Sequence, residues 1–338
     1  MNLKESIKKL SLLSGISGFE SNVSQYLIDN YSHIFDDCFI DTMGNFIACK
    51  KSKSGFGSVM IEAHIDEIGL MVRYIDENGY LLTEPVGGID SRILPGSEVT
   101  VHGKTDCKGI VFSGEKQSET PTFDLLYVDI GLNKEEVSEI VDIGSPISLV
   151  PSFTDLQDGY ISSKCLDDRA CVAILLDCIE KLKDADLGYD LYLCACVQEE
   201  VGLRGSLTAA YTVNPDLAIA VDVTHASTPD EKNGTFKCGC GPVICKGPNL
   251  HSILTSKFIK VMEKNKINYE IEVEPGDTGT DAWSIQTARE GIPTILLSLP
   301  IKYMHTPIET AMMSDCSQTS EAICDFLKSF ERTEDILC

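Results

Sequence analysis

The sequence predicts a mixed, largely parallel α/β sheet with helices on both faces, plus a small inserted all-β domain that resembles a barrel. Two patterns support this prediction. From about residue 162 onward, apolar strand-like runs alternate with helical segments, as in βαβ units. Between residues 68 and 158 short β-like runs are instead separated by glycine-rich turns. We therefore expect a discontinuous larger domain, residues 1–67 and 159–338, with an inserted domain at residues 68–158.

The elements of the larger domain follow from hydrophobic periodicity. We expect one N-terminal helix and then a strand at residues 58–63. Residues 169–183 are apolar nearly all round, so this helix should be buried. Further strands are expected at 190–198, 217–222, 268–274 and 294–299, and further helices at 203–211, 250–264, 280–289 and 316–331. Inside the insert, β-like runs are expected at 70–75, 98–102, 109–113 and 125–129.

Charge and composition narrow the class of protein. The formal net charge is −24 and no cluster of lysine and arginine is visible, which argues against a nucleic-acid or membrane partner. The N-terminus lacks the apolar core of a signal peptide, and no apolar stretch approaches the ~20 residues of a membrane span. The 14 cysteines sit singly in apolar segments, as free thiols do in a reducing compartment. We therefore expect a cytoplasmic protein.

Two adjacent glutamates, Glu199 and Glu200, follow the apolar run that begins at Asp190, and a Val-Gly-Leu-Arg-Gly turn comes next. Paired carboxylates at the end of a buried strand are costly to desolvate unless a cation holds them. No lysine or arginine precedes them nearby, so a metal is the favoured cation. One glutamate would then be a ligand and the other a base.

Other metal-binding side chains also lie at, or just after, the ends of expected strands, where ligands of open α/β sheets gather. Asp66 could orient the ring of His64. The nitrogen and oxygen donors suit zinc, cobalt or manganese. The four segments are His64-Ile-Asp66, Asp167-Asp168, Asp222 and His305.

Each of these segments, taken alone, also has a structural explanation. His64 and Asp66 could form an ordinary hydrogen-bonded pair, and the Asp167-Asp168 pair could cap the helix that follows. Asp222 could simply end its strand, and His305 could cap a loop. The combination of histidines and acids at the ends of one set of strands is what favours a metal centre.

Charge balance favours two ions. One aspartate of the 167–168 pair, Glu199, Glu200 and Asp222 bring four negative charges, which two divalent ions would balance. One bridging carboxylate would leave room for a water or hydroxide between the ions, as in two-metal hydrolysis. A thiolate site at Cys238, Cys240 and Cys245 is disfavoured because no second C-x-x-C motif is present. The glycine-rich segment 276–281 is expected to shape a pocket wall.

Together the motifs resemble the tetrahedral (TET-type) dinuclear metallo-aminopeptidases, the glutamyl/leucyl aminopeptidase family, some members of which carry an endoglucanase label. The resemblance extends from Ser14-Gly-Ile-Ser-Gly-Phe-Glu20 to His305. The motifs are Ala-His64-x-Asp66-Glu-Ile-Gly, Asp167-Asp168-Arg, Gln-Glu199-Glu200-Val-Gly-x-Arg-Gly, Asp222-Val-Thr, Gly-Thr-Asp281-Ala and Tyr-x-His305-Thr-Pro-x-Glu.

The resemblance implies the role of each residue. Asp167 would be the bridging carboxylate, a choice over Asp168 that the residues alone leave open, and the peptide between them would be cis. One ion would take His64 and Asp222, and the other Glu200 and His305. Glu199 would be the general base, and Asp66 would assist catalysis by orienting His64.

The resemblance also implies that the insert is a dimerisation domain and that dimers assemble into hollow dodecamers. Residues 114–123 lack the Pro-Pro-His element usual in the insert, which leaves the subunit contacts less certain. Lys302 and Thr306 stand where arginine and serine are common, and neither is expected to be a ligand.

The sequence therefore predicts an aminopeptidase that removes N-terminal residues from short peptides, with two zinc or cobalt ions, or manganese, and with Glu199 taking a proton from the bridging water. A glycosidase that uses Glu199 and Glu200 is one alternative. Its carboxyls should stand ~5–9.5 Å apart across a sugar bond, which neighbouring residues rarely achieve, and it leaves the histidines unexplained. A non-catalytic scaffold with structural metals is the other, although structural sites tend to be closed. The preferred N-terminal residue stays open.

Overall fold

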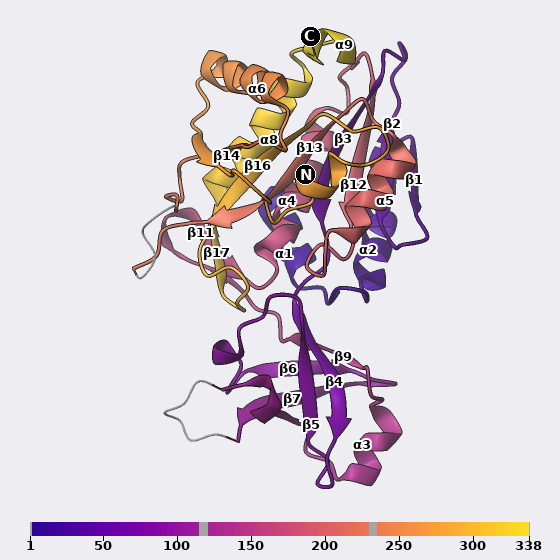
Figure 1. Ribbon diagram of the computed structural model, residues 1–338, viewed down its shortest axis with the longest axis vertical. Coiled ribbons are helices and arrows are strands. Elements are labelled where there is room, and N and C mark those ends of the chain that lie inside the picture. Colours follow the sequence, from indigo (N-terminus) through magenta and orange to yellow (C-terminus); the bar gives the residue numbers. More distant parts are fainter. Residues whose placement is uncertain (1, 115–120, 230–234, 338) are drawn as a thin grey trace.

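An eight-stranded mixed sheet forms the frame of the larger part of the protein, at the top of Figure 1. The computed structural model describes residues 2–114, 121–229 and 235–337. The strands, in spatial order, are β1 (Asp37–Ile40), β2 (Phe46–Lys50), β12 (Asp190–Cys196), β3 (Ser58–His64), β13 (Leu217–His225), β16 (Thr294–Ile301), β14 (Val243–Lys246) and β15 (Glu270–Val273). The four central strands, β12, β3, β13 and β16, are parallel, as are β14 and β15. The predicted mixed sheet with a parallel centre is confirmed.

Helices cover both faces of this sheet, because its central strands are apolar on both sides. On one face, Ile61 and Ile219 pack in a cluster with α4 (Leu166–Lys181), α6 (Ser252–Asn265) and α8 (Met313–Leu327). On the other face, Met60 and Ala218 pack with α5 (Arg204–Val213) and α7 (Ala282–Ile285). The helix α4 is buried along almost its whole length, as its apolar sequence predicted.

Several element predictions need correction. The N-terminal segment holds two helices, α1 (Leu3–Ser11) and α2 (Ser21–Tyr31), rather than one, and a left-handed glycine, Gly18, lies between them. The helix expected over 280–289 is only α7, which ends at Ile285; the chain continues in turns to Arg289, whose φ is 51°. The strand expected to end at Asp222 continues to His225, since β13 pairs with β16 over its whole later half. A short helix, α9 (Thr333–Leu337), closes the described chain.

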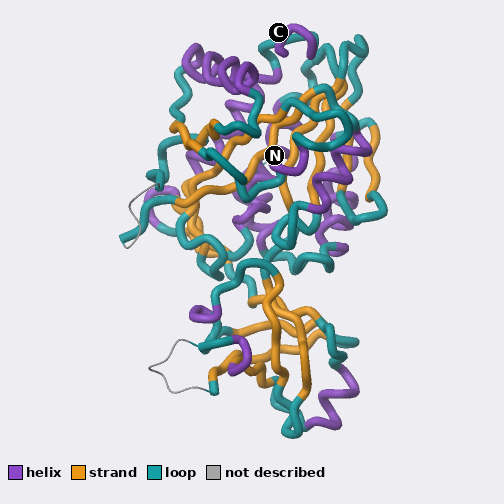
Figure 2. Tube along the Cα trace, viewed as in Figure 1, coloured by secondary structure: helices purple, strands orange, loops and turns teal. Residues whose placement is uncertain are grey.

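The smaller part of the molecule is a closed antiparallel barrel of six strands, at the bottom of Figure 1 and largely orange in Figure 2. Alternate side chains such as Val72, Val99 and Val111 fill its interior. One helix, α3 (Lys134–Ile140), lies beside the strands, so the insert is not all β. In order around the barrel the strands are β4 (Gly69–Ile75), β5 (Leu81–Val86), β8 (Leu126–Asp129), β7 (Asp106–Ser113), β6 (Glu98–His102) and β9 (Pro146–Leu149).

A three-stranded sheet brings the chain that leaves the barrel against the chain that follows β16. Its order is β10 (Phe153–Asp155), β11 (Tyr160–Ser163) and β17 (Glu309–Met312). Because β11 leads into α4, this pairing places the start of α4 beside the segment that contains His305.

The sequence predicted free cysteines and no membrane-spanning segment, and both expectations can be compared with the described residues. Every cysteine among them is a free thiol. None of their helices combines the length and the apolarity needed to cross a bilayer. Of the segment that lacks the Pro-Pro-His element, residues 115–120 lie outside the described residues.

Candidate metal centre

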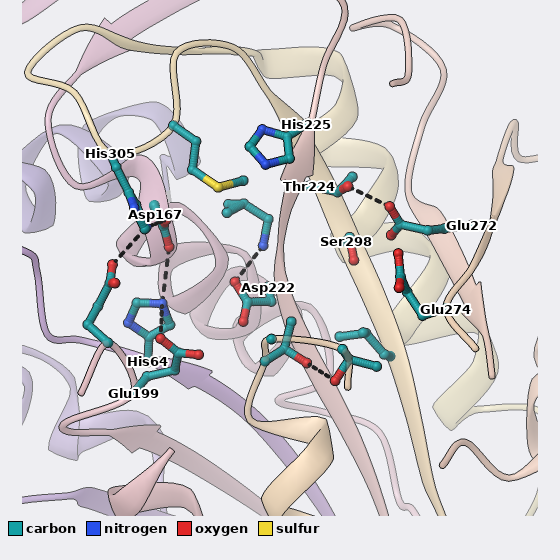
Figure 3. A pocket seen from close by; sticks show the side chains of 17 residues that line it. His64, Asp167, Glu199, Asp222, Thr224, His225, Glu272, Glu274, Ser298 and His305 are labelled. Carbon is teal, nitrogen blue, oxygen red and sulfur yellow. Dashed lines mark hydrogen bonds and ion pairs between the residues drawn. The ribbon is translucent and has the colours of Figure 1, made fainter. Parts of the chain in front are cut away.

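The five predicted metal ligands meet at one edge of the central sheet (Figure 3). Glu200 follows β12. His64 is the last residue of β3, and Asp222 lies in the second half of β13. Asp167 stands at the start of α4, and His305 follows β16. Parallel strands carry their carboxyl ends to a common edge, so side chains from distant parts of the sequence converge there.

Asp167 lies between the two histidines. Its Oδ1 is 3.1 Å from Nε2 of His64, and its Oδ2 is 3.2 Å from Nε2 of His305. Two groups of potential ligand atoms, each within 4.8 Å of one another, share this aspartate: one contains His64 and Asp222, the other Glu200 and His305. The peptide between Asp167 and Asp168 is cis, as the resemblance implied.

The two adjacent glutamates occupy different positions. Glu200 Oε1 is 3.2 Å from Nε2 of His305, beside Asp167. Glu199 Oε2 is 3.9 Å from Nε2 of His64, and the Glu199 side chain faces the cavity (Figure 3). Glu200 is therefore within the group that contains His305, and both glutamates also have potential ligand atoms within 4.8 Å of one of His64.

Asp66 lies behind His64 and contacts the glutamate pair as well. Its Oδ1 is 3.4 Å from Nδ1 of His64, and this carboxylate accepts hydrogen bonds from the backbone N–H groups of Glu199 and Glu200 at 3.0 and 3.2 Å. The Ser17 hydroxyl donates a further bond to it at 2.6 Å. One buried carboxylate thus holds the backbone that carries both glutamates and lies next to the ring of a candidate ligand, without a hydrogen bond to it.

The site holds an excess of buried negative charge. Burial raises the pKa of Glu199 to about 10 and that of Asp222 to about 7. Burial alone would lower the pKa of His305, but its hydrogen bonds to Asp167 and Glu200 raise the value to about 11. Among the described residues no lysine or arginine lines the cavity. Imidazole and carboxylate donors around uncompensated charge fit divalent cations.

Glu309 is a residue to which the sequence analysis assigned no role. Its Oε2 accepts the backbone N–H of Asp167 at 3.1 Å, and its Oε1 accepts that of His305 at 2.9 Å. This buried carboxylate on β17 therefore ties together the backbones of two candidate ligands. Its place in the Tyr-x-His-Thr-Pro-x-Glu motif was the available signal, but sequence spacing does not show which backbone groups a side chain reaches.

Arg169 was also missed. Its guanidinium is fully buried and donates to the backbone carbonyl of Ile65 at 2.8 Å. Other donors reach three carbonyls of the N-terminal segment, and Glu67, itself paired with Lys164, lies beside them. Arg169 thereby anchors the segment after α1 to the chain just beyond His64. The three carbonyls are those of Leu10, Leu13 and Gly15.

A glycine from the loop after β5 touches the metal site. The Gly88 carbonyl oxygen lies 3.2 Å from Nδ1 of His305, on the ring nitrogen opposite the one that faces Asp167. A Cβ at this position would lie only 2.9 Å from that nitrogen. The close approach requires glycine, and through it the insert forms a wall of the site.

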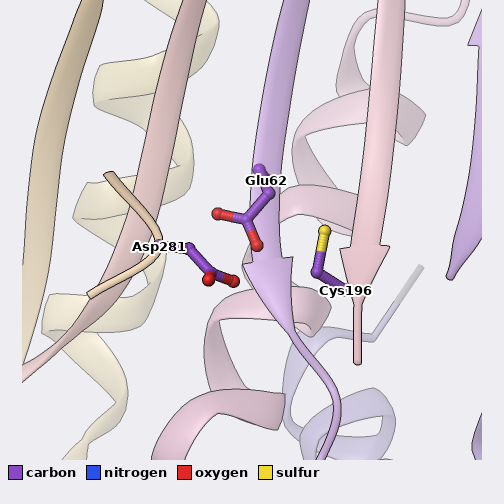
Figure 4. A group of neighbouring side chains, drawn as sticks. All are labelled: Glu62, Cys196 and Asp281. Carbon is purple, nitrogen blue, oxygen red and sulfur yellow. The ribbon is translucent and has the colours of Figure 1, made fainter. Parts of the chain in front are cut away.

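A second buried acidic group lies next to the site (Figure 4). Glu62 on β3, Cys196 at the end of β12 and Asp281 before α7 have potential ligand atoms within 4.8 Å of one another. Burial and the nearby charge of Asp281 raise the pKa of Glu62 well above its usual value. Burial likewise raises the pKa of the Cys196 thiol. The raised pKa values favour the protonated forms of both groups, and we interpret the carboxyl pair as sharing a proton rather than binding a third metal.

The weaker sequence candidates have clear outcomes. Cys238, Cys240 and Cys245 are all described and do not form a group with metal-binding distances. The glycine-rich segment before α7 does shape a pocket wall: Thr278, Gly279 and Thr280 line a cavity of about 300 Å³ that contains the metal site.

Comparison with known proteins places these features in a family. The M42 glutamyl aminopeptidase family matches residues 44–321. The lysyl aminopeptidase of Pyrococcus furiosus is 34% identical, over 97% of this chain and 99% of that protein. An aminopeptidase from Desulfurococcus kamchatkensis superposes with a TM-score of 0.92 at 32% identity, over 99% of this chain and 96% of that one.

A third similar protein has been described in larger assemblies. The TET1 peptidase of Pyrococcus horikoshii, which can assemble into a tetrahedron or a large octahedral shell, has a TM-score of 0.85 at 31% identity, over 97% of this chain and all of that one. The family match covers most of the sequence, and the similar structures extend over both the sheet and the barrel. The chain therefore belongs to the M42 glutamyl aminopeptidase family and is a peptidase.

Proposed function

We propose that the protein removes N-terminal residues from short peptides and that it works with two divalent metal ions. The observation that carries this proposal is the position of Asp167, whose two carboxylate oxygens face different histidines at 3.1 and 3.2 Å. In this proposal Asp167 would be the ligand that the two ions share, His64 and Asp222 would complete one ligand set, and Glu200 and His305 would complete the other.

The proposed chemistry assigns one task to each group. When bound, two divalent ions would polarise the scissile carbonyl, lower the pKa of a water and offer a position for the free amino terminus. Glu199 takes a proton from the attacking water and returns it to the leaving amine. Asp66 keeps the ring of His64 and the backbone of Glu199 in fixed positions throughout. Zinc and cobalt suit the mixed donor set, and manganese is also compatible.

An assay with aminoacyl-p-nitroanilides tests the proposal. We expect activity in the presence of zinc, cobalt or manganese, loss after treatment with a chelator, and recovery when metal is restored. A glycosidase would act on sugar substrates and in general would not depend on a metal. A non-catalytic scaffold would bind metal but cleave neither class of substrate. Either result would refute the aminopeptidase proposal.

We also propose that the barrel is a dimerisation domain, that dimers form larger closed assemblies, and that the protein works in the cytoplasm. The tetrahedron and octahedral shell named for the similar Pyrococcus horikoshii peptidase support the second point, and the first rests on the family resemblance. The free thiols of the described cysteines fit a reducing compartment.

A further inference from the structure

The cavity beside the metal centre carries two carboxylates that the metals would not balance. Asp167, Glu199, Glu200 and Asp222 line the end nearest the histidines, where two divalent ions would offset their four charges. Glu272 and Glu274 line the opposite end (Figure 3). No lysine or arginine is among the described residues that line the cavity, and no described cation pairs with either glutamate.

The strand β15, which holds Glu272, and the residue that directly follows it, Glu274, bring both of these carboxylates to the cavity. Side chains two residues apart in a strand share a face, and Glu272 and Glu274 are so spaced. The side chain between them, Val273, points away and is 69% exposed. Burial, joined by the neighbouring charge of Glu274, raises the pKa of Glu272, although a hydrogen bond from Thr224 opposes this shift. The two like charges therefore lie close together, and no cation among the described residues neutralises them.

Two hydroxyl groups lie beside these carboxylates. The Thr224 hydroxyl donates to Oε1 of Glu272 at 2.8 Å, which leaves the other oxygen, Oε2, without a bond to a described residue. Ser298, on β16, is 1% exposed and lines the cavity, and among the described residues its hydroxyl has no hydrogen-bond partner. Carboxylate oxygens and a hydroxyl are acceptors that match the three donors of an ammonium group.

Apolar side chains form part of the cavity wall. Val223, Leu296 and Met304 line it, together with polar residues such as His225, Thr278 and Thr280. A lysine or arginine side chain matches this lining, because its apolar stem could contact the apolar residues while its charged head reaches the carboxylates. With the amino terminus held at the metal end, such a stem would pass these apolar residues and bring the charge to Glu272 and Glu274.

We propose that Glu272 and Glu274 make the site selective for peptides whose N-terminal residue is lysine or arginine. This inference rests on the proposed aminopeptidase function, since it takes the cavity to receive the first side chain of the substrate. The same carboxylates repel N-terminal glutamate and aspartate, and a leucine side chain offers no group that could pair with them.

The first experiment compares substrates on the metal-loaded protein. We expect kcat/KM for the p-nitroanilides of lysine and arginine to exceed that of leucine by roughly tenfold or more, the range for an added bond to a charged group. The glutamate substrate should be slowest. Binding of L-lysinol and L-norleucinol, which have no bond to cleave and differ mainly in the ammonium group, is measured in parallel by calorimetry. Lysinol should bind at least tenfold tighter.

Variants of the edge strand then assign the effect to residues. Glu272→Gln and Glu274→Gln should each lower the ratio of lysine to leucine kcat/KM about tenfold and weaken lysinol binding to match. Glu270→Gln is the matched control, because it removes the same charge from the same strand at a residue that does not line the cavity. If one glutamine variant fails to fold, the other still tests whether a carboxylate at this end of the cavity selects lysine.

The outcomes separate the inference from the proposed function. Faster cleavage of leucine or glutamate substrates than of lysine would overturn the selectivity and leave the aminopeptidase function intact. If the protein cleaves no substrate, the proposed function is refuted, and the binding of lysinol and norleucinol still tests the inference. Equal affinity for the two compounds would overturn it. Tighter binding of lysinol that both glutamine variants lose would support it.

Discussion

At the scale of single residues, the glutamate pair shows how one backbone segment serves two tasks. Asp66 accepts hydrogen bonds from the N–H groups of both Glu199 and Glu200, so the two side chains leave a common fixed point. From there Glu200 reaches His305, and Glu199 reaches the side of His64. Substitutions in the pair should therefore separate metal binding from proton transfer.

We expect Glu199→Gln to lower kcat by roughly 10²–10⁴-fold, the usual contribution of a general base, while the protein keeps both metals. Elemental analysis beside the p-nitroanilide assay measures the two effects. His305→Ala is the comparison, because losing a ligand should lower metal content as well as activity. Metal loss in Glu199→Gln, or full metal content in His305→Ala, would show that these roles are misassigned.

Metal binding should release protons, and the number should depend on pH. In the metal-free protein the pKa values of His305 and Asp222 are about 11 and about 7, and both groups must lose their protons to act as ligands. His305 releases a proton at both pH 6 and pH 8, whereas Asp222 still holds one only at pH 6. We expect zinc affinity to rise with pH and about one proton fewer to be released at pH 8.

Calorimetry in buffers with different ionisation enthalpies counts these protons. Glu20→Gln is the control, because burial also raises the pKa of Glu20 to about 7 but this residue is not a candidate ligand. The control should show the same pH dependence as the parent protein. A proton count that does not change between pH 6 and pH 8 would contradict the assignment of Asp222.

The sequence predicted these residues better than their arrangement. Strand ends can be identified from apolar runs, and histidine and acid side chains at those ends identified the segments that hold all five candidate ligands, whereas the choice within each acidic pair came from the family resemblance. The choice between Asp167 and Asp168 was not available from the pattern, because adjacent residues share the same local sequence. The structure separates them: Asp167 faces both histidines, whereas Asp168 Oδ2 accepts the backbone N–H of His64.

At the scale of elements, the loop after β5 couples the barrel to the site through Gly88. We expect Gly88→Ala to displace the ring of His305, since the new methyl group would lie 2.9 Å from its Nδ1. Contacts that orient a metal ligand are typically worth ~10–100-fold in metal affinity, so a loss of this size is expected, measured by competition with a chelator.

Gly276→Ala is the control for this substitution, because no heavy atom lies within 4 Å of the Cβ it would add. Its metal affinity should match that of the parent protein. Unchanged affinity in Gly88→Ala would show that the ring of His305 tolerates the displacement, and the contact would then have no role in metal binding.

Elements were predictable where their patterns were strong. The buried helix α4 and the central strands have long apolar runs, and they were found. The strand β5 contains Pro85, which disfavours a strand in sequence, and β14 has only four residues, so neither was predicted. The number of N-terminal helices was also predicted wrongly. One helix was expected, whereas the structure has two, separated by a turn that contains the left-handed Gly18.

At the scale of the whole molecule, large apolar side chains remain exposed on the barrel. Tyr74, Ile110 and Ile143 are 46%, 48% and 68% exposed. If the barrel is the dimerisation domain, some of these side chains should be covered in the assembly. We expect Ile110→Lys or Ile143→Lys to lower the mass of the particle, measured by light scattering after size exclusion, because a buried lysine would lack a partner.

Ile253→Lys is the control, since Ile253 is 44% exposed but lies on α6, away from the barrel. It should leave the particle unchanged. A mass that falls with Ile253→Lys and not with the barrel variants would move the interface to the α/β region of the molecule.

The route of the chain gives the metal centre a further consequence. The chain enters the barrel just after His64 and returns from it just before Asp167, and these two side chains meet although 103 positions separate them in sequence. Ions shared between them would act as a clip across the base of a long loop, and closing such a loop removes much of the freedom of the unfolded chain. The buried ion pair of Lys164 and Glu67, which are 97 positions apart, is a second link between the two ends of the insert. The cofactor would thus hold the ends of the insert together as well as activate water.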